Sequence, residues 1–332
     1  MKKILLSPWT ALITLVLILS IRITDPGFVE SVRLRYFDQL VTSQPAKDVP
    51  VHVVNIDEAS LDKYGQYPFS RDVYAAIIKD LYARQAGLVV FNILMPEADR
   101  FKQDPALAKI MQAHPVVLPT VGNIKPKNTP QEHGVSIMGQ HPQGLIVEFP
   151  GLIANTPVIE KAAAGVGIVN TFPEVDGVVR RTPLVIYSNE KLYPSLALEA
   201  LRVAAGDPSF QIKIGEAGVE ALRIPQFGKI TTDSLSRVWI DWAATPKQYS
   251  LVELPKTFNN EIVIVGVSAV GLANPVATSK GEVMPQDLQA AALGTMMTGS
   301  TIQRPEWADY SEMLAMLVAG VLVIFFGIWK RT

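Results

Sequence analysis

The stretch from residue 51 to residue 94, VHVVNIDEASLDKYGQYPFSRDVYAAIIKDLYARQAGLVVFNIL, decides the fold class. Its two ends, residues 51–57 and 88–94, are short apolar runs rich in Val and Ile, as expected of buried strands. Between them, residues 71–85 carry apolar side chains at helical spacing. A strand, a helix and a second strand in this order predict a βαβ unit, whose two strands run parallel.

The flanking sequence extends this unit into a mixed α/β domain. A helix over residues 104–112 and a strand over 116–121 enlarge the sheet, and a polar loop follows at 123–143. The elements expected after the loop are a hairpin of strands 166–171 and 178–187 turning at Asp176-Gly177, a helix at 194–205, weak strands at 211–214, 221–224, 229–232 and 238–241, a strand at 261–267 and a helix at 285–298. The second half is therefore expected to be more antiparallel than the first.

The composition points to a membrane and excludes several classes of protein. The chain has 332 residues, 48% of them hydrophobic and only 18% charged, and its mean hydropathy is +0.23. Soluble domains carry about 25% charged residues. A net charge of −1 offers no basic excess for nucleic acid. With no cysteine, the chain has no disulfide, no thiolate metal site and no cysteine nucleophile.

The excess hydrophobicity lies at the two ends of the chain. Residues 4–21 contain no charge, and residues 313–329 are apolar throughout. About 18 residues at about 1.5 Å each are enough to cross a hydrocarbon core. We therefore expect transmembrane helices at 4–22 and 313–329, flanking a mixed sheet domain with an N-terminal βαβ unit and a more antiparallel second half.

The basic residues beside the spans predict the orientation. Lys2 and Lys3 precede the first span, and Lys330 and Arg331 follow the second. Lys and Arg concentrate on the cytoplasmic side of membrane proteins. Both termini are thus expected in the cytoplasm, with residues 24–310 outside it. A cleaved signal peptide is the alternative for the first run, although residues 20–24 offer no small-x-small cleavage site.

Two polar residues end the first two predicted strands. Asp57 follows the first and Asn92 lies in the second, so both are expected at the edge of a parallel sheet where ligands usually bind. An acid there suits a cation or a hydroxyl-rich ligand. The alternative is structural, with Asp57 capping the turn that follows.

Ser268 follows a buried strand at a glycine-flanked turn, which resembles the nucleophile elbow of hydrolases. The spacing does not fit, because two residues rather than one separate Ser268 from Gly271. The four histidines are His52, His114, His133 and His141, and their spacing does not match a metal site. The sequence also has no glycine-rich phosphate-binding loop. No metal site, cofactor or catalytic residue is expected.

Arginines supply the remaining ligand-binding candidates. Arg71 opens a helix, where the helix dipole disfavours a cation, so a carboxylate partner such as Asp57 or Asp38, or a ligand, is expected. Arg180, near Asp176, and the adjacent Arg181 are able to grip an anion. Alternatively, the two arginines alternate across a strand and form surface ion pairs.

These segments together resemble the CHASE2 domain. The residues that carry the resemblance are 30–38, IDEASL at 56–61, GQYPFSR at 65–71, VVFNIL at 89–94, GIVN at 167–170, PEVDGVVRRTPL at 173–184, YPSLA at 193–197 and IVIVGVSA at 262–269. Their ordered series covers about residues 28–300 and is far more specific than any single motif. Asn92 and Tyr67 depart from the family pattern, which usually has aspartate and tryptophan there; the loss of a carboxylate puts a cation site shared with Asp57 in doubt.

The resemblance implies an extracytoplasmic sensor in the inner membrane of a bacterium, linked to a cytoplasmic effector such as an adenylate or diguanylate cyclase or a kinase. The printed sequence ends at Thr332 after one following span, where the family often has three. It is therefore either truncated or an unusual stand-alone member.

We expect an unknown small-molecule or protein signal, the lipid bilayer and a second copy as partners, the last through Ala315, Ala319 and Gly320. The helix at 285–298 is the expected path to the second span, with Gly294, Gly299 and Pro305 as flexible points. The alternative function is a scaffold or assembly subunit that senses nothing.

Overall fold

The computed structural model describes residues 8–42, 44–132, 134–302 and 307–329. Their contacts divide the chain into two units, a helical unit from residues 1–39 and 303–332 and an α/β unit from residues 40–302. Lys2, Lys3, His133, Pro305, Lys330 and Arg331 lie outside the described residues.

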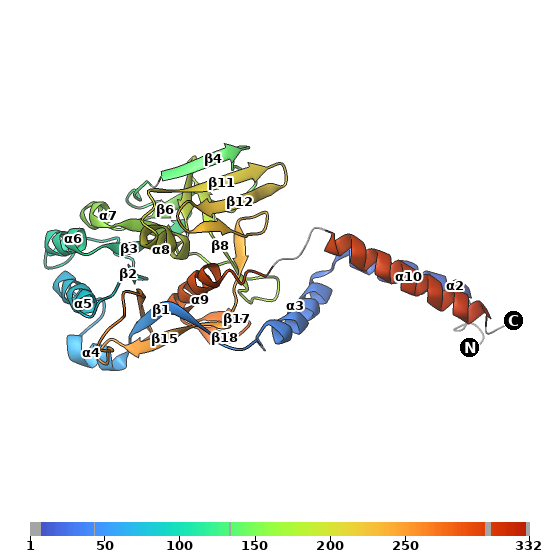
Figure 1. The fold of residues 1–332 in the computed structure, drawn as a ribbon, viewed down its shortest axis with the longest axis horizontal. Helices are drawn as coiled ribbons and strands as arrows, with labels where there is room; N and C mark the ends of the chain where they lie inside the picture. The colour runs from blue at the N-terminus through green and yellow to red at the C-terminus, as the bar shows by residue number, and fades with distance from the viewer. Residues whose placement is uncertain (1–7, 43, 133, 303–306, 330–332) are drawn as a thin grey trace. The chain divides into compact units, whose positions relative to one another are not determined.

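A seven-stranded sheet forms the centre of the α/β unit (Figure 1). In spatial order its strands are β15 (Ala244–Ser250), β1 (Lys47–Ile56), β16 (Ile262–Val267), β2 (Leu88–Phe91), β3 (Val116–Asn123) and β6 (Gly151–Ile153), with β7 (Gly165–Ile168) also paired to β3. All neighbours run parallel except β3 and β6. The predicted βαβ unit is confirmed, but β1 and β2 are not adjacent, because β16 lies between them.

Helices cover both faces of this sheet, so its strands are apolar on both sides. Val54 and Val265 belong to the core cluster under one set of helices, and Val53 and Ile264 to the core cluster under the other set. The first set is α4 (Glu58–Tyr64), α5 (Arg71–Ala83), α6 (Asp104–Ala113) and α7 (Pro157–Ala162), and the second is α8 (Leu196–Ala204) and α9 (Pro285–Thr298). Figure 1 shows the two sets on opposite sides of β1 and β2.

The remaining strands form four small sheets. They are β10 (Lys191–Pro194), β9 (Val185–Ser188) and β5 (Glu148–Phe149); β13 (Gly228–Ile230), β12 (Gly218–Ile224), β11 (Ser209–Gly215) and β4 (Gly134–Gly139); β14 (Arg237–Trp239) with β8 (Arg181–Pro183); and β17 (Val276–Thr278) with β18 (Gly281–Val283). Of the weak strands expected in the second half, those at 211–214, 221–224 and 229–232 form the antiparallel meander β11–β12–β13. The strand expected at 238–241 is β14, which pairs with β8 instead. The predicted polar loop at 123–143 contains β4, a strand that periodicity missed.

The predicted hairpin at Asp176-Gly177 is wrong. Its first strand, β7, pairs with β3 in the central sheet, whereas β8 pairs with β14 and β9 with β10. The Asp-Gly turn closes only a short loop, in which Gly177 N donates to Glu174 O at 2.9 Å. The tight hairpin joins β9 to β10 at Asn189-Glu190, where φ is 48° and 62°, the positive pair of values that matches the twist of the strands.

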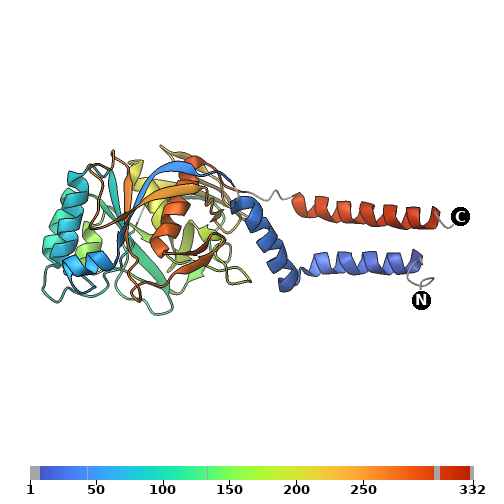
Figure 2. The ribbon, with the colours of Figure 1, turned by 90° about the horizontal axis from the view of Figure 1, so that it is seen from below.

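The helical unit contains α2 (Pro8–Thr24), most of α3 (Gly27–Thr42) and α10 (Ala308–Trp329). Helices α2 and α10 lie side by side and run antiparallel (Figure 2). Near the end of α2, Arg22 forms ion pairs with Asp309 at 2.5 Å and Glu312 at 2.9 Å at the start of α10. Further along, a Cβ added at Gly320 would overlap the Leu15 side chain, so the small residue permits the close approach.

The two expected transmembrane helices differ in how clearly they are found. Among the described residues, Ala308–Phe326 is the one stretch that is by itself long and apolar enough to cross a membrane. Helices α2 and α3 pass the same test of length and composition only as a pair, and that pair is bent by 80° at its break. By itself, a helix with the length and composition of a span is therefore found only at the C-terminal end.

Candidate functional site

Three polar residues follow strands at one edge of the central sheet. Because β15, β1, β16 and β2 are parallel, their carboxyl ends meet at this edge, and ligands of such sheets bind there. Asp57 follows β1, Ser268 follows β16 and Asn92 follows β2. Backbone hydrogen bonds fix their order, since Ser268 N donates to Ile56 O at 3.0 Å and Asn92 N donates to Val265 O at 2.8 Å. Ser268 therefore lies between Asp57 and Asn92, which are not neighbours as predicted.

Asp57 has the structural role that was its alternative interpretation. It is the N-cap of α4, where its Oδ1 accepts hydrogen bonds from Ser60 N at 3.0 Å and from Ser60 Oγ at 2.6 Å. Partial burial works to raise the pKa of Asp57, but the hydrogen bonds from Ser60 and Ser250 outweigh it and lower that pKa. The carboxylate is thus ionised, and it is bound by Ser60 of the helix that it caps, as in a capping box.

Ser268 and Asn92 are half-buried side chains at the same edge. Neither the Ser268 hydroxyl nor the Asn92 amide forms a hydrogen bond with another described residue. A turn rather than a helix follows Ser268, unlike a nucleophile elbow. This edge therefore offers a hydroxyl and an amide to a polar ligand, and not an activated nucleophile.

Arg71 has the carboxylate partner that its position predicted, but the partner is neither Asp57 nor Asp38. Its Nε donates to Asp104 Oδ1 at 2.8 Å, and a second guanidinium nitrogen donates to Glu97 O at 2.9 Å. Asp104 begins α6, where a negative charge is favoured by the helix dipole. Both side chains are buried. The pair joins the starts of α5 and α6, and Arg71 is occupied by protein groups.

Arg180 is fully buried, which contradicts the surface interpretation of the arginine pair. Its two terminal nitrogens donate to the two carboxylate oxygens of Asp176, each at 2.8 Å. Arg180 lowers the pKa of Asp176 by donating these hydrogen bonds, against the opposing effect of burial. Arg181 lies less deeply and pairs with Glu174 at 2.7 Å. Both arginines bind carboxylates of the protein, so the structure gives them a structural role.

Sequence reasoning missed Gln286, which joins the carboxyl edge to α9. Its Nε2 donates to Asn55 Oδ1 at 2.8 Å and to Val267 O at 3.2 Å, so it contacts the ends of both β1 and β16. It is buried in the first turn of α9. A Cβ added at Gly266 would lie 2.5 Å from Gln286 Cδ. The signal in the sequence was the glycine at 266 inside an otherwise bulky strand.

A groove between α6 and α7 is a second feature that periodicity did not reveal. It encloses about 720 Å³ and is lined by Pro105, Ala108, Lys109, Gln112, Pro157, Val158 and Lys161. None of the six ligand-binding candidates lines it.

The part of the chain that the structure describes contains no cluster of metal-binding side chains. No group of three or more His, Asp or Glu side chains there is able to hold a metal ion. His52 is buried and contacts Glu261 at 2.5 Å, and His114 stacks on Tyr82.

The described residues define a mixed α/β domain with helices at both ends, whose candidate site residues mostly make structural hydrogen bonds and ion pairs. A family model described as the CHASE2 domain matches residues 12–328. The chain therefore belongs to the CHASE2 family, a family of extracytoplasmic sensor domains, and the resemblance seen in the sequence is confirmed. No curated protein and no solved structure matches it.

Proposed function

We propose that this protein is a membrane-anchored extracytoplasmic sensor that transmits a signal through α2 and α10 to a cytoplasmic effector. The observation that carries the proposal is the antiparallel contact of these helices, with Arg22 bound to Asp309 and Glu312 at one end of the pair. A domain whose two ends enter an antiparallel helix pair is able to convert a movement of its ends into a shift between the helices.

The length of α10 supports the anchoring, whereas the described part of α2 is slightly shorter than the hydrocarbon core is thick. Helix α10 has 22 residues, which span about 33 Å, and α2 has 17 residues, which span about 26 Å. The hydrocarbon core is about 30 Å thick. If both helices cross the bilayer, their antiparallel arrangement is consistent with both termini on one side, and the basic residues Lys2, Lys3, Lys330 and Arg331 favour the cytoplasm as that side.

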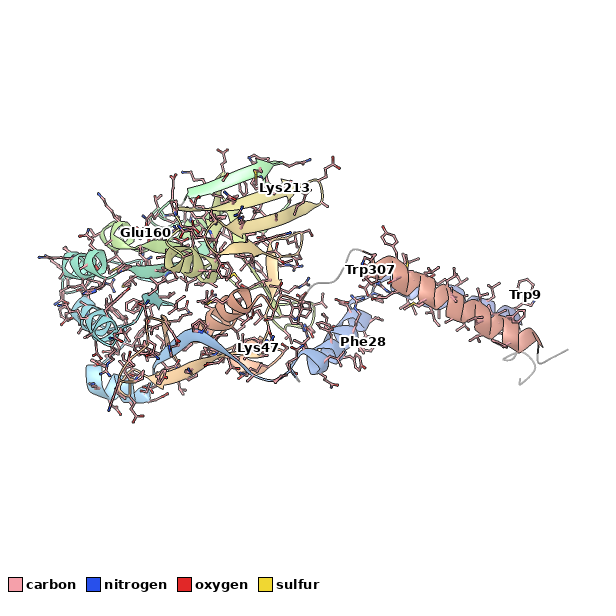
Figure 3. All side chains as sticks on the ribbon, viewed as in Figure 1. Trp9, Phe28, Lys47, Glu160, Lys213 and Trp307 are labelled. Atoms are coloured by element: carbon pink, nitrogen blue, oxygen red, sulfur yellow. The ribbon has the colours of Figure 1, made fainter. Side chains whose placement is uncertain are left out.

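The proposed location of the α/β domain, residues 24–310, is outside the cytoplasm of a bacterium. The charge cluster of Arg22, Asp309 and Glu312 then lies at the outer end of the spans, where charged side chains reach water and pair with one another. Trp307 immediately precedes α10 at the same end (Figure 3). It is 67% exposed, as expected of an interfacial aromatic residue.

The proposed path of the signal starts at the carboxyl edge of the sheet. A polar ligand bound by Ser268 and Asn92 would contact the carboxyl ends of β16 and β2 and be able to shift them. Gln286 links β16 and β1 to the first turn of α9, and α9 ends at Gly299, whose φ of 64° permits a change of direction before α10. Gly294, expected as a flexible point, is buried inside α9, where an added Cβ would lie 3.1 Å from the Cβ of Ala244.

A dimer through α10 is part of the proposal. Ala315 and Ala319 are exposed one turn apart, so a second copy has close access to them. Gly320 contacts Leu15 of its own chain and is therefore occupied within the monomer. The signal itself, a small molecule or a protein, and an effector of the cyclase or kinase class complete the proposed set of partners.

Labelling of single cysteines tests this topology, because the chain has none of its own. Lys213→Cys lies on the α/β domain, at an exposed position (Figure 3). In intact cells, a membrane-impermeant maleimide is expected to label this variant. A cysteine in place of Lys2 should be labelled only after the membrane is permeabilised. The reverse pattern would exclude an external sensor.

The second candidate is a scaffold that senses nothing. It is favoured by Asp57, whose carboxylate is occupied in a cap, and by Asn92, which replaces the acid usual in the family. A screen of small polar molecules by thermal shift separates the two functions. A saturable rise in the melting temperature that is lost in Asn92→Ala supports the sensor, whereas no ligand-dependent shift supports the scaffold.

A further inference from the structure

Helix α3 carries an exposed apolar stripe immediately after α2. Phe28 is 80% exposed, Val32 54% and Tyr36 66%, and Leu40 continues the series one turn later at 55%. Successive members are four residues apart, so each lies about 40° further around the helix than the last. The four residues therefore form one continuous face, from which Phe28 projects in Figure 3.

The other sides of α3 are different in character. Leu34 and Val41 are buried on the side away from the stripe. Ser31 and Asp38 lie on the polar side between these two faces. Arg33 and Arg35 flank the stripe on its two edges, and Arg33 is paired with Asp25 at 3.3 Å and with Glu30. An apolar face bordered by basic residues is the pattern of helices that lie in a membrane interface.

The bend between α2 and α3 gives the direction of the stripe's helix. The two helices meet at an angle of 80° across a break at residues 25–26. If α2 crosses the bilayer along its normal, a helix bent by 80° from it runs almost in the plane of the membrane. The break follows the last residue of α2, so α3 begins at the depth where the span leaves the hydrocarbon core.

We infer that α3 is an interfacial helix whose stripe of Phe28, Val32, Tyr36 and Leu40 inserts into the outer leaflet of the bilayer. This inference rests on the proposed function, since it requires α2 to be a span. Phe and Tyr suit the boundary between headgroups and acyl chains. Arg35, at one edge of the stripe, is placed to reach the phosphates, whereas Arg33 at the other edge is paired with Asp25 and Glu30. Helices of this kind bury their apolar face about 5–10 Å deep.

A second copy of the chain is the other occupant that an apolar stripe would fit. The bend and the flanking arginines favour lipid, because a helix lying in the membrane plane already presents its face to the bilayer and needs no partner protein.

Spin labels on single cysteines test the inference in the full-length chain, reconstituted in vesicles of phosphatidylethanolamine and phosphatidylglycerol. Labels at Phe28→Cys, Val32→Cys and Tyr36→Cys are compared with matched labels at Ser31→Cys and Asp38→Cys on the polar side of the same helix. The measurement is the ratio of relaxation by oxygen, which concentrates in lipid, to relaxation by a water-soluble nickel complex. We expect this ratio to be several-fold higher at the three stripe positions than at the two polar positions.

Control labels on the spans separate the two proposals. Labels at Val16→Cys in α2 and Val321→Cys in α10 should report lipid if the spans cross the bilayer. If they do and the stripe labels respond to nickel as Ser31→Cys does, the interfacial helix is refuted and the anchoring stands. If the stripe labels are shielded from both reagents, and the same cysteines left unlabelled form disulfides between chains, a second copy covers the stripe and the inference is also refuted. If the span labels report water, the anchoring itself fails.

Discussion

Replacing Arg180 by methionine should destabilise the α/β domain strongly, because it leaves a buried carboxylate without its charged partner. The Arg180 side chain is fully buried and that of Asp176 is 2% exposed, and two hydrogen bonds of 2.8 Å join them. Removing one member of a buried pair costs about 3–5 kcal/mol. For a domain of this size each kcal/mol lowers the melting temperature by about 2–4 °C, so a drop on the order of 10 °C is expected.

The adjacent Arg181 provides the matched control. It forms the same kind of pair with Glu174 at 2.7 Å, but its side chain is 24% exposed. A partly exposed pair is worth about 1 kcal/mol or less, so Arg181→Met should cost only a few degrees. The measurement is thermal unfolding of the purified full chain in mild detergent, followed by near-ultraviolet circular dichroism, which reports packing around aromatic side chains.

A double variant checks that the loss comes from the unpaired charge. Asp176→Leu combined with Arg180→Met replaces the pair by apolar groups, and such replacements are often neutral relative to the intact pair. We expect it to recover most of the loss. If Arg180→Met melted no lower than Arg181→Met, the pair would not stabilise the domain, and Arg180 would return as a candidate for anion binding.

Three further predictions concern the edge, the pH dependence and the helix pair. Gly266→Ala should force Gln286 out of its position and cost about 1–3 kcal/mol of unfolding free energy, measured by denaturant titration; an unchanged midpoint would mean that the contact is loose. The pKa of Asp176 is lowered in the folded state, so its stabilisation is complete above the unfolded pKa of about 3.9 and is lost as pH falls through the lower folded value. Asp176→Asn should therefore lose less melting temperature than the wild type between pH 6 and pH 3. The difference corresponds to at most about 1 kcal/mol of unfolding free energy, because pH 3 lies only about one pH unit below the unfolded pKa, and an equal loss in both would contradict this. Arg22→Glu places a third acid beside Asp309 and Glu312. It should slow the formation of a disulfide between cysteines introduced at Leu15 in α2 and Gly320 in α10, whereas Arg22→Lys should retain most of the rate.

Local patterns in the sequence predicted individual elements well where spacing and flanking residues agreed. The helix at 285–298 was predicted with the observed bounds, because Pro285 begins it and Gly299 ends it. The alternative interpretation of Asp57, as a helix cap, is confirmed: Ser60, three residues later, completes the capping box. These features depend on neighbours in the chain and are therefore readable from it.

Strand order and long-range partners were not readable in the same way. Asn92 was expected beside Asp57, but β16, which comes about 170 residues later in the chain, lies between their strands. Arg71 was expected to have an acid partner because of its helix position, and the identity of that partner, Asp104, depended on how α5 and α6 pack. Similarly, nothing local distinguishes the buried Arg180 from the half-exposed Arg181 that follows it.

The antiparallel pairing of α2 with α10 is the central claim of this account, and a disulfide between them tests it most directly. Leu15→Cys and Gly320→Cys are combined in the full chain, which otherwise has no cysteine, and the protein is oxidised in native membranes. The control combines Gly320→Cys with Ile13→Cys, whose side chain is exposed. The account predicts rapid formation of a disulfide within one chain for the first pair and little for the control. An absent disulfide, or one formed only between chains, would contradict it.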